Sequence, residues 1–443
     1  MCLKYSCFEC SFKVSKRSTT FLLFFMNVYL VGGAVRDKLL NLSIKDRDWV
    51  VVGSSPGEML SKNYQQVGND FPVFIHPTSG EEYALARTER KTGVGYGGFE
   101  CYAGKDVSLE EDLSRRDLTI NAMAESPSGD IIDPFNGRQD LDKKILRHVS
   151  EAFTEDPLRV LRVARFHARY GNLGFSVAEE TLQLMTKISQ SGELENLTVE
   201  RVWAETEKAL LEPNPRLYFE TLRQCKALVA LFPDVDVLFG VPQPAKHHPE
   251  IDTGLHTLMV LDQAVITSQS FGKQEQLAIR FAALTHDLGK GKTPEDILPS
   301  HHGHEDISEF LTKALCKQYK VPSHAARIAT LVSRYHTQCH IAFELKPSTV
   351  MRLMEALDVL RRPETLPLFL AACEADAKGR TGFENRDYAQ ADYLTDAAAT
   401  LKQVDPKTIL DLGFRGEALG NEIRQRRIKA LKVLKNNYTQ ASQ

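Results

Sequence analysis

The sequence predicts an α+β protein, in which a mixed α/β unit is followed by an all-helical remainder. Short β-branched runs separated by turns extend from Met26 to about Gly137. From about Asp140 onward, long stretches with helical apolar periodicity replace them. The chain has 443 residues, which at roughly 150 residues per domain predicts about three structural units.

Composition and charge restrict the class of protein. Hydrophobic residues make up 42% and charged residues 26% of the chain, which excludes a disordered polypeptide and a multi-span membrane protein. The net charge is only -3, so a nucleic-acid partner would need a local basic surface. The eight cysteines are too sparse for a disulfide framework, which indicates a reducing cytoplasm.

Residues 1–25 are expected to be an extension outside the fold. Lys13, Lys16 and Arg17 precede an apolar run, a layout that resembles a signal peptide. The run continues into a glycine turn without a small-residue cleavage site, however. Met26 lies directly before the first predicted strand and is an alternative start of the protein.

The predicted elements follow from these patterns. Strands are expected at 28–31, 49–52, 73–75, 83–86 and 131–132. Helices are expected at 157–169, 199–211, 275–288 and 349–360. A proline-containing linker at 241–245 divides the helical part, and ten of the thirteen histidines lie between His247 and His340. A separate histidine-dependent domain therefore begins after the linker. Six basic residues at 424–435 form either an RNA-facing helix or a solvated face.

The first predicted strand leads into a candidate phosphate site. It ends in Gly32 and Gly33, which allow close backbone approach to a phosphate, and Arg36 follows one turn later. Asp46 and Asp48 lie two residues apart at the start of the next strand, which predicts both carboxylates on one face, where they can hold a pair of Mg²⁺ ions. Either element alone could be an ordinary turn, but together they favour a nucleotide site.

Two arginine clusters fit the same ligand. Arg116 belongs to an Arg-Arg-Asp run at 115–117 that can supply cations to a triphosphate. Arg159, Arg162 and Arg165 recur every three residues on one helix, where they repel each other and need anionic partners; we expect a nucleotide or an RNA backbone to provide them.

Asp156 lies one turn before Arg159. A carboxylate acceptor beside a guanidinium donor matches the base edges of cytosine and adenine, which predicts selection of CTP and ATP.

Four motifs together carry a family resemblance. LVGGAVRD (30–37), KDRDWVVVG (45–53), RRDLTINAM (115–123) and EDPLRVLRVARF (155–166) resemble the bacterial class II CCA-adding tRNA nucleotidyltransferases, and more narrowly the multifunctional CCA proteins with an additional HD domain. The resemblance implies a polymerase-β-like nucleotidyltransferase head followed by all-α neck, body, HD and tail regions. The expected boundaries are 26–150 for the head, 151–245 for the neck and body, 253–354 for the HD domain and 355–443 for the tail.

The resemblance also implies residue roles. Gly33 and Arg36 would contact the triphosphate and Asp46 and Asp48 would hold Mg²⁺. Nucleotide binding would fall to Arg116, Arg162 and Arg165, and base selection to Asp156 and Arg159. The segment 93–98, with Arg90 and Lys91 before it, matches a loop that helps to switch from CTP to ATP. Asp112 is a candidate third metal carboxylate.

The histidine pattern predicts a second metal site. Neutral imidazoles with a carboxylate suit a divalent transition metal. His256, His286, Asp287 and His336 match the spacing of the HD phosphohydrolase superfamily. His301, His302 and His304 are candidates for supporting groups, and Asp376 is a further possible ligand. In multifunctional CCA proteins this domain implies phosphatase, 2′-nucleotidase and 2′,3′-cyclic phosphodiesterase activities with Ni²⁺; the sequence leaves manganese and cobalt open.

The leading hypothesis is addition of C, C and A to tRNA from CTP and ATP, coupled to hydrolysis at the histidine site. We expect a cytoplasmic protein with tRNA as partner and without a membrane; monomer and homodimer both remain open. One rival is a poly(A) polymerase, which shares the head. Another is an HD phosphohydrolase with a nucleotide-sensing head. A non-enzymatic RNA-binding scaffold explains neither the carboxylate pair nor the histidine cluster.

Overall fold

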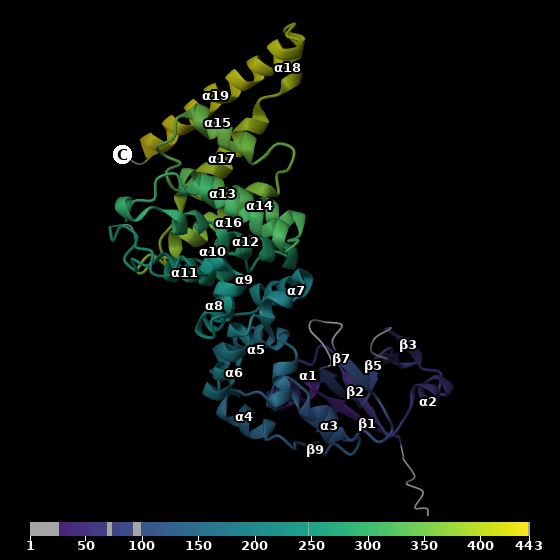
Figure 1. The fold of residues 1–443 in the computed structure, drawn as a ribbon. Coiled ribbons are helices and arrows are strands. Elements are labelled where there is room, and N and C mark those ends of the chain that lie inside the picture. The colour runs from purple at the N-terminus through teal and green to yellow at the C-terminus, as the bar shows by residue number, and fades with distance from the viewer. Residues whose placement is uncertain (1–25, 69–72, 92–98, 247, 442–443) are drawn as a thin grey trace, which may run out of the picture.

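A mixed sheet forms the N-terminal unit in the computed structural model, which describes residues 26–68, 73–91, 99–246 and 248–441 (Figure 1). Its seven strands follow the order β3-β4-β5-β2-β1-β8-β9. They are β1 (Asn27–Val31), β2 (Asp48–Val52), β3 (Gln65–Val67), β4 (Val73–Ile75), β5 (Glu82–Leu85), β8 (Ala124–Glu125) and β9 (Ile131–Ile132). Within the described part of this sheet, β2 and β5 pair in parallel and the other neighbouring strands pair antiparallel.

The register between β1 and β2 brings the glycine turn and Asp48 to the same end of the sheet. Val31 pairs with Asp48 across this antiparallel pair. The glycine turn after β1 and the carboxylate at the start of β2 therefore lie at the same end of the sheet. Val50 and Val51 belong to separate hydrophobic clusters, as the alternation of side chains along a strand requires.

The five predicted strands are present, each within one residue of the expected bounds. The sequence analysis missed β3, β8 and an antiparallel ribbon of β6 (Thr88–Lys91) and β7 (Phe99–Tyr102). The expectation that strands end near residue 140 is wrong, because β10 (Ile145–Leu146) pairs in parallel with β11 (Ser176–Val177). Two-residue strands are too short to produce a periodic pattern.

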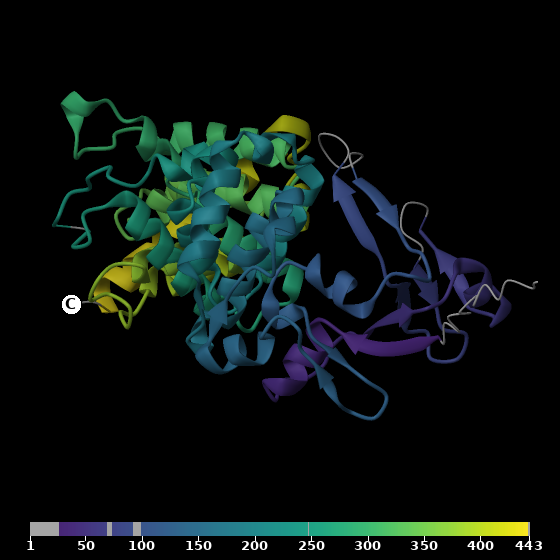
Figure 2. The ribbon, with the colours of Figure 1, turned by 60° about the horizontal axis from the view of Figure 1, so that its bottom comes forward.

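Helices make up the rest of the molecule (Figure 2). Those of the N-terminal unit are α1 (Gly33–Leu39), α2 (Pro56–Ser61), α3 (Leu109–Ser114) and α4 (Gly137–Lys143). The body contains α5 (Leu158–Tyr170), α6 (Glu179–Gln190), α7 (Val199–Leu210), α8 (Pro215–Gln224), α9 (Ala227–Leu231) and α10 (Pro233–Asp236). The histidine-rich part contains α11 (Thr253–Thr267), α12 (Lys273–Thr285), α13 (His304–Gln318), α14 (Ser323–His340), α15 (Pro347–Ala356) and α16 (Thr365–Lys378). The chain continues through α17 (Ala389–Gln403), α18 (Pro406–Asp411) and α19 (Gly416–Ala441).

The helix expected at 275–288 ends earlier than predicted. α12 stops at Thr285, and Asp287 has φ −110, outside the helical range. Short 3₁₀ turns follow, η5 (Leu288–Lys292) and η6 (Glu295–Ile297). The His286–Asp287 pair therefore lies where the helix terminates, and Nδ1 of His286 bonds to the carbonyl of Ala283 in its last turn at 2.8 Å.

One large hydrophobic cluster joins the parts of the chain, from Leu30 in β1 to Leu431 in α19. Buried Arg280 adds a polar link, since its Nη1 donates to the carbonyl oxygens of Leu210 and Glu212 at 2.9 and 3.2 Å. Among the described residues, no helix combines the length and apolar character needed to span a membrane.

Candidate functional site

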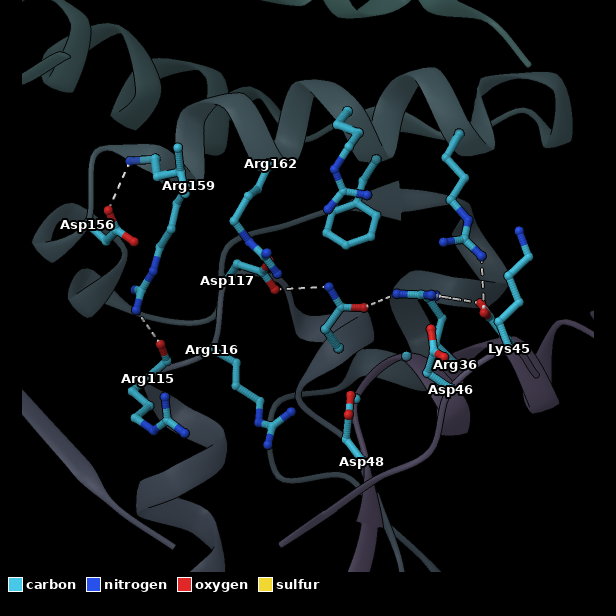
Figure 3. A pocket seen from close by; sticks show the side chains of 18 of the residues that line it. Arg36, Lys45, Asp46, Asp48, Arg115, Arg116, Asp117, Asp156, Arg159 and Arg162 are labelled. Atoms are coloured by element: carbon cyan, nitrogen blue, oxygen red, sulfur yellow. Dashed lines mark hydrogen bonds and ion pairs between the residues drawn. The ribbon is translucent and has the colours of Figure 1, made fainter. Parts of the chain in front are cut away.

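A cavity of about 590 Å³ lies between the sheet and α5 (Figure 3). Arginines of α5 point into it from one side, and Asp48 points into it from the other. Nine residues that the sequence analysis selected line this cavity: Gly33, Arg36, Asp46, Asp48, Arg116, Asp156, Arg159, Arg162 and Arg165. The structure therefore brings together residues from all four motifs.

The excess of positive charge in the cavity favours binding of a polyanion. Ten basic side chains line it against five aspartates. The basic ones are Arg36, Lys45, Arg87, Arg115, Arg116, Arg159, Arg162, Arg165, Arg169 and Arg201. The volume lies within the roughly 300–1,000 Å³ that small-molecule sites occupy. A nucleoside triphosphate fits both the size and the charge.

Asp46 and Asp48, the two carboxylates expected to hold Mg²⁺, lie in different backbone elements. Asp48 is the first residue of β2, whereas Asp46 lies in the preceding loop. The expectation that both stand on one strand is therefore wrong, although both line the cavity. Burial raises the pKa of Asp48, Arg116 opposes this effect, and repulsion from Asp46 adds to it. A bound cation would relieve that repulsion, so the pair fits a magnesium site.

The glycine turn makes room for arginines. Gly32 has a φ of 67°, and a Cβ added there would lie 2.9 Å from Nη1 of Arg116. A Cβ on Gly33 would lie 3.3 Å from Nη2 of Arg36. These glycines are needed because two guanidinium groups pack against the turn.

Arg36 is fixed before any ligand binds. Its Nε donates to Asp37 at 2.8 Å, and its Nη1 donates to Asn121. The guanidinium carbon lies 5.3 Å from the ring centroid of Phe166 and 5.1 Å from that of Tyr170. This arrangement positions the cation at the cavity wall.

The arginines of α5 already have partners in the protein. Arg162 lies 2.6 Å from Asp117, and Arg165 lies 2.6 Å from Glu205. Arg159 donates at 2.6 Å to the carbonyl oxygens of Ala152 and Arg115. The expectation that a ligand must supply the anions for this helix is therefore wrong. The sequence did not indicate these partners because they come from distant segments.

Asp156 has a partner that the sequence analysis missed. Its Oδ2 accepts from Nη2 of Arg201 in α7 at 2.9 Å, and its Oδ1 accepts from the backbone N–H of Leu158 at 3.1 Å. Asp156 and Arg159 thus line one cavity but are held by different groups. Arg201 lies 45 residues beyond Asp156, too far for any local motif to indicate the contact.

Asp112, the candidate third metal carboxylate, serves a different purpose. It is fully buried and does not line the cavity. Its carboxylate accepts from Arg115 at 2.8 Å and from Arg116 at 3.1 Å. Asp112 therefore holds arginines in place. The segment 93–98 lies outside the described residues.

The predicted histidine site forms a buried cluster. His256, His286, Asp287 and His336 are each at most 4% exposed. Nε2 of His286 lies 3.1 Å and Nε2 of His336 lies 3.5 Å from the Asp287 carboxylate. The structure thus brings together a helix residue, a helix terminus and a second helix that are far apart in the sequence.

Two further residues join the cluster. Asp376 in α16 lies 3.2 Å from Nε2 of His256, and His304 lies 3.3 Å from Asp287. The potential ligand atoms form three triads among the described residues, each within 4.8 Å. Two contain the predicted ligands: His256, His286 and Asp376, and Asp287, His304 and His336. The third contains His248, Glu250 and His256. His302 is exposed, and His301 instead contacts Thr293 and the carbonyl of Pro242.

The cluster has the properties of a metal site. Nε2 of His286 and Oδ1 of Asp287 are buried without a hydrogen-bond partner. Burial opposes ionisation of Asp287, but the charges of His286 and Lys290 hold its pKa well below the usual range. Burial lowers the pKa of His336 to about 3, which keeps its imidazole neutral. Neutral nitrogen and anionic oxygen donors suit a divalent transition metal.

Family models match three stretches of the chain. The "Poly A polymerase head domain" matches residues 28–147, the "Probable RNA and SrmB- binding site of polymerase A" matches 174–239, and the "HD domain" matches 253–377. The last match extends beyond the expected boundary at 354 and includes Asp376.

Two relatives are similar over nearly the whole chain. The multifunctional CCA protein of Hahella chejuensis is 56% identical, covering 93% of this chain and 96% of the relative. That of Alcanivorax borkumensis is 58% identical, covering 93% and 98%.

Solved structures share the fold. A CCA-adding enzyme in its apo form II has a TM-score of 0.62 at 21% identity, covering 94% of this chain and 92% of the other. The Thermotoga maritima CCA-adding enzyme complexed with tRNA has a TM-score of 0.60 at 20% identity, with the same coverage. These structures support a nucleotidyltransferase head followed by a helical body.

Proposed function

The chain belongs to the multifunctional CCA protein family, and on this basis we propose that it adds C, C and A to the 3′ end of tRNA from CTP and ATP without a nucleic-acid template. The observation that supports this proposal is that nine motif residues line one cationic cavity. Two of the nine are the carboxylates Asp46 and Asp48. Solved relatives with the same fold include complexes with tRNA, CTP and ATP.

The proposed reaction joins the tRNA 3′-oxygen to the α-phosphorus of the nucleotide. The bond between the α-phosphorus and its bridging oxygen to the β-phosphate breaks, and pyrophosphate leaves. Arg36, Arg116, Arg162 and Arg165 line the cavity as cations for the triphosphate. Fixed positive groups of this kind stabilise the negative charge of the transition state.

Asp46 and Asp48, which line the same cavity, would hold Mg²⁺. When bound, Mg²⁺ lowers the pKa of the attacking hydroxyl and stabilises charge on the leaving group. The chain itself binds and orients the nucleotide. Asp156 offers an acceptor and Arg159 a donor for the base, and contacts with Arg201, Ala152 and Arg115 hold these two side chains.

Extension of a tRNA transcript that lacks its terminal CCA tests this proposal. The purified protein is incubated with Mg²⁺ and each nucleotide, separately and together, and the products are resolved to single nucleotides. We expect two additions with CTP alone and three with CTP plus ATP, followed by a stop. Long tails from ATP alone would instead identify a poly(A) polymerase. If the tRNA is not extended but phosphate is released, a phosphohydrolase with a nucleotide-sensing head would be favoured.

We further propose that the histidine cluster hydrolyses phosphate esters at RNA ends, as a phosphatase, 2′-nucleotidase and 2′,3′-cyclic phosphodiesterase. His256, His286, Asp287, Asp376, His304 and His336 would hold the metal, for which we propose Ni²⁺. A metal of this type polarises a phosphoryl oxygen and lowers the pKa of bound water. The buried, unpartnered donor atoms support this proposal.

Phosphate release from 2′-AMP and ring opening of 2′,3′-cyclic AMP test the second activity. Metal-stripped protein is assayed with Ni²⁺, Mn²⁺, Co²⁺ or Mg²⁺ added singly. We expect the fastest hydrolysis with Ni²⁺ and its loss on substituting His286 with Ala. Equal rates with every metal would contradict the choice of nickel, and retained hydrolysis in the variant would contradict the site.

A further inference from the structure

The linker before the histidine-rich helices contributes side chains to the metal cluster. Residues 241–252 fall between two family models, one ending at 239 and the next beginning at 253. The linker folds back on itself, since the N–H of Gln243 donates to the carbonyl of Ile251 at 2.6 Å and Pro242 bridges to Asp252. Both ends of the segment are therefore held near α11.

Two linker side chains are buried against the cluster. The amide oxygen of Gln243 accepts from Nζ of Lys290 at 2.6 Å, and that Nζ lies 2.6 Å from Asp287. The carboxylate of Glu250 lies 3.0 Å from Nδ1 of His248 and 3.0 Å from Nδ1 of His256. The Glu250 side chain is 4% exposed, so this carboxylate is an internal group.

Glu250 and the candidate metal site lie on opposite edges of the same imidazole. Nε2 of His256 faces Asp376 at 3.2 Å. Nδ1 faces the carbonyl of Gly379 at 3.0 Å and Glu250 at 3.0 Å. A neutral imidazole carries one proton, and His256 has acceptors on both edges. A cation bound between Nε2 and Asp376 would exclude the proton from Nε2, and the two acceptors at Nδ1 would then hold it there.

We propose that Glu250 is a positioning residue for the metal centre, which fixes the ring orientation and tautomer of His256 so that Nε2 can bind the ion. A carboxylate behind a ligating histidine also raises the basicity of that ligand. This inference rests on the proposed function, because it requires a metal at His256, His286 and Asp376. It assigns the linker a part in the metal site.

The contacts that His256 keeps without Glu250 limit how much metal binding is lost. The Gly379 carbonyl remains as an acceptor when the carboxylate is removed. Loss of Glu250 should therefore weaken metal binding by about 10- to 100-fold without abolishing it.

The experiment uses the full chain with Asp46 and Asp48 replaced by Ala, so that the head carboxylates do not bind the probe. Co²⁺ is titrated into metal-free protein by calorimetry, and its visible absorption reports the ligand geometry. The variants are Glu250→Gln, which keeps the shape of the side chain, and Glu250→Ala. Glu295→Gln is the matched control because Glu295 is exposed in the 3₁₀ turn η6.

The proposal expects a 10- to 100-fold rise in the Kd for Co²⁺ and an altered absorption band in both Glu250 variants. The unfolding temperature of metal-free Glu250→Gln should match that of its parent, and Glu295→Gln should change neither property. If the Kd and the spectrum are unchanged in the Glu250 variants, the positioning role of Glu250 is wrong, whereas the proposed metal site still stands. Loss of one whole ion, with the others bound as before, would make Glu250 a ligand and overturn its positioning role. If the parent protein, with Asp46 and Asp48 replaced by Ala, binds no Co²⁺, the proposed metal site itself is wrong.

Discussion

Arg162 and Asp117 form an ion pair of 2.6 Å at the wall of the cavity between the sheet and α5, and they join α5 to the end of the Arg-Arg-Asp motif. Asp117 is buried and also accepts from Nδ2 of Asn121 at 2.9 Å. The carboxylate therefore fixes both an arginine and the amide that contacts Arg36.

Asp117→Asn should impair nucleotide use, because it removes the negative partner of Arg162. A hydrogen bond to a charged group contributes about 1.5–3 kcal/mol, so we expect kcat/KM for CTP to fall roughly tenfold or more. Single-nucleotide extension kinetics measure this change. Asp142→Asn is the control, since Asp142 is exposed on α4; equal losses in both variants would refute a specific role for Asp117.

The same pair should make stability sensitive to acid. Burial opposes ionisation of Asp117, but Arg162 and Asn121 hold the pKa of this carboxyl far below its usual range. A carboxyl whose pKa is depressed by folding contributes stability above its unfolded pKa, and this contribution is lost as pH falls through the folded pKa. The stability difference between wild type and Asp117→Asn should therefore be constant from pH 7 to about 5 and shrink below about 4. Urea unfolding at each pH tests this expectation, and a difference that grows on acidification would contradict it.

Gly32→Ala should weaken triphosphate binding. The backbone at Gly32 has a φ of 67°, and the added Cβ would meet Arg116 at 2.9 Å. We expect a stability loss of about 1–3 kcal/mol and a higher KM for CTP and ATP. Gly57→Ala is the matched control, because a Cβ at this helical glycine meets nothing within 4 Å. Thermal unfolding and extension kinetics distinguish the two variants, and equal behaviour would show that the turn tolerates a side chain.

Arg201→Gln should reduce base selectivity. Arg201 holds one oxygen of Asp156 at 2.9 Å and so orients the proposed acceptor for the amino group of cytosine or adenine. We expect the ratio of kcat/KM for CTP over UTP to fall roughly tenfold, which corresponds to the loss of about 1.4 kcal/mol. The comparison is with Arg138→Gln, an exposed arginine on α4. An unchanged ratio, even with slower CTP addition, would exclude Arg201 from base selection.

The two sites should be separable by mutation. The carboxylates Asp46 and Asp48 line the cavity of the head, whereas His286 and Asp287 belong to the buried histidine cluster. Replacing both Asp46 and Asp48 with Ala should reduce CCA addition by on the order of 100-fold or more and leave hydrolysis of 2′,3′-cyclic AMP intact. His286→Ala should have the opposite effect. Loss of both activities in either variant would indicate that the sites depend on each other.

Local motifs predicted which residues line the cavity of the head, because the relevant groups are close in sequence. Gly33 and Arg36 lie within one turn, and the three arginines of α5 share one helix. Their anionic partners were not predicted, because Asp117 and Glu205 lie 45 and 40 residues away from them. No periodicity or spacing encodes such contacts; tertiary packing alone creates them.

The histidine cluster shows the same limit. The spacing of His256, His286, Asp287 and His336 was recognisable, whereas Asp376, which lies 120 residues beyond His256, was only a further possible ligand because no local motif surrounds it. Glu250 is similarly hidden, because its role depends on the linker folding back. In the sheet, the strands with apolar β-branched runs were predicted, including the short Ile131–Ile132. Polar strands such as β3 (Gln-Gln-Val) and β6 (Thr-Glu-Arg-Lys) were missed, since they leave no apolar pattern.

The hydrophobic cluster that runs from Leu30 to Leu431 also has a thermodynamic consequence. Apolar contacts within this cluster couple the unfolding of the body, the histidine-rich helices and the tail, whereas the sheet also packs two smaller clusters of its own. Cutting the chain between body and histidine-rich helices would leave Arg280 without its carbonyl acceptors and expose apolar faces on both fragments. A substitution that loosens the tail would thus lower the thermal tolerance of both activities together.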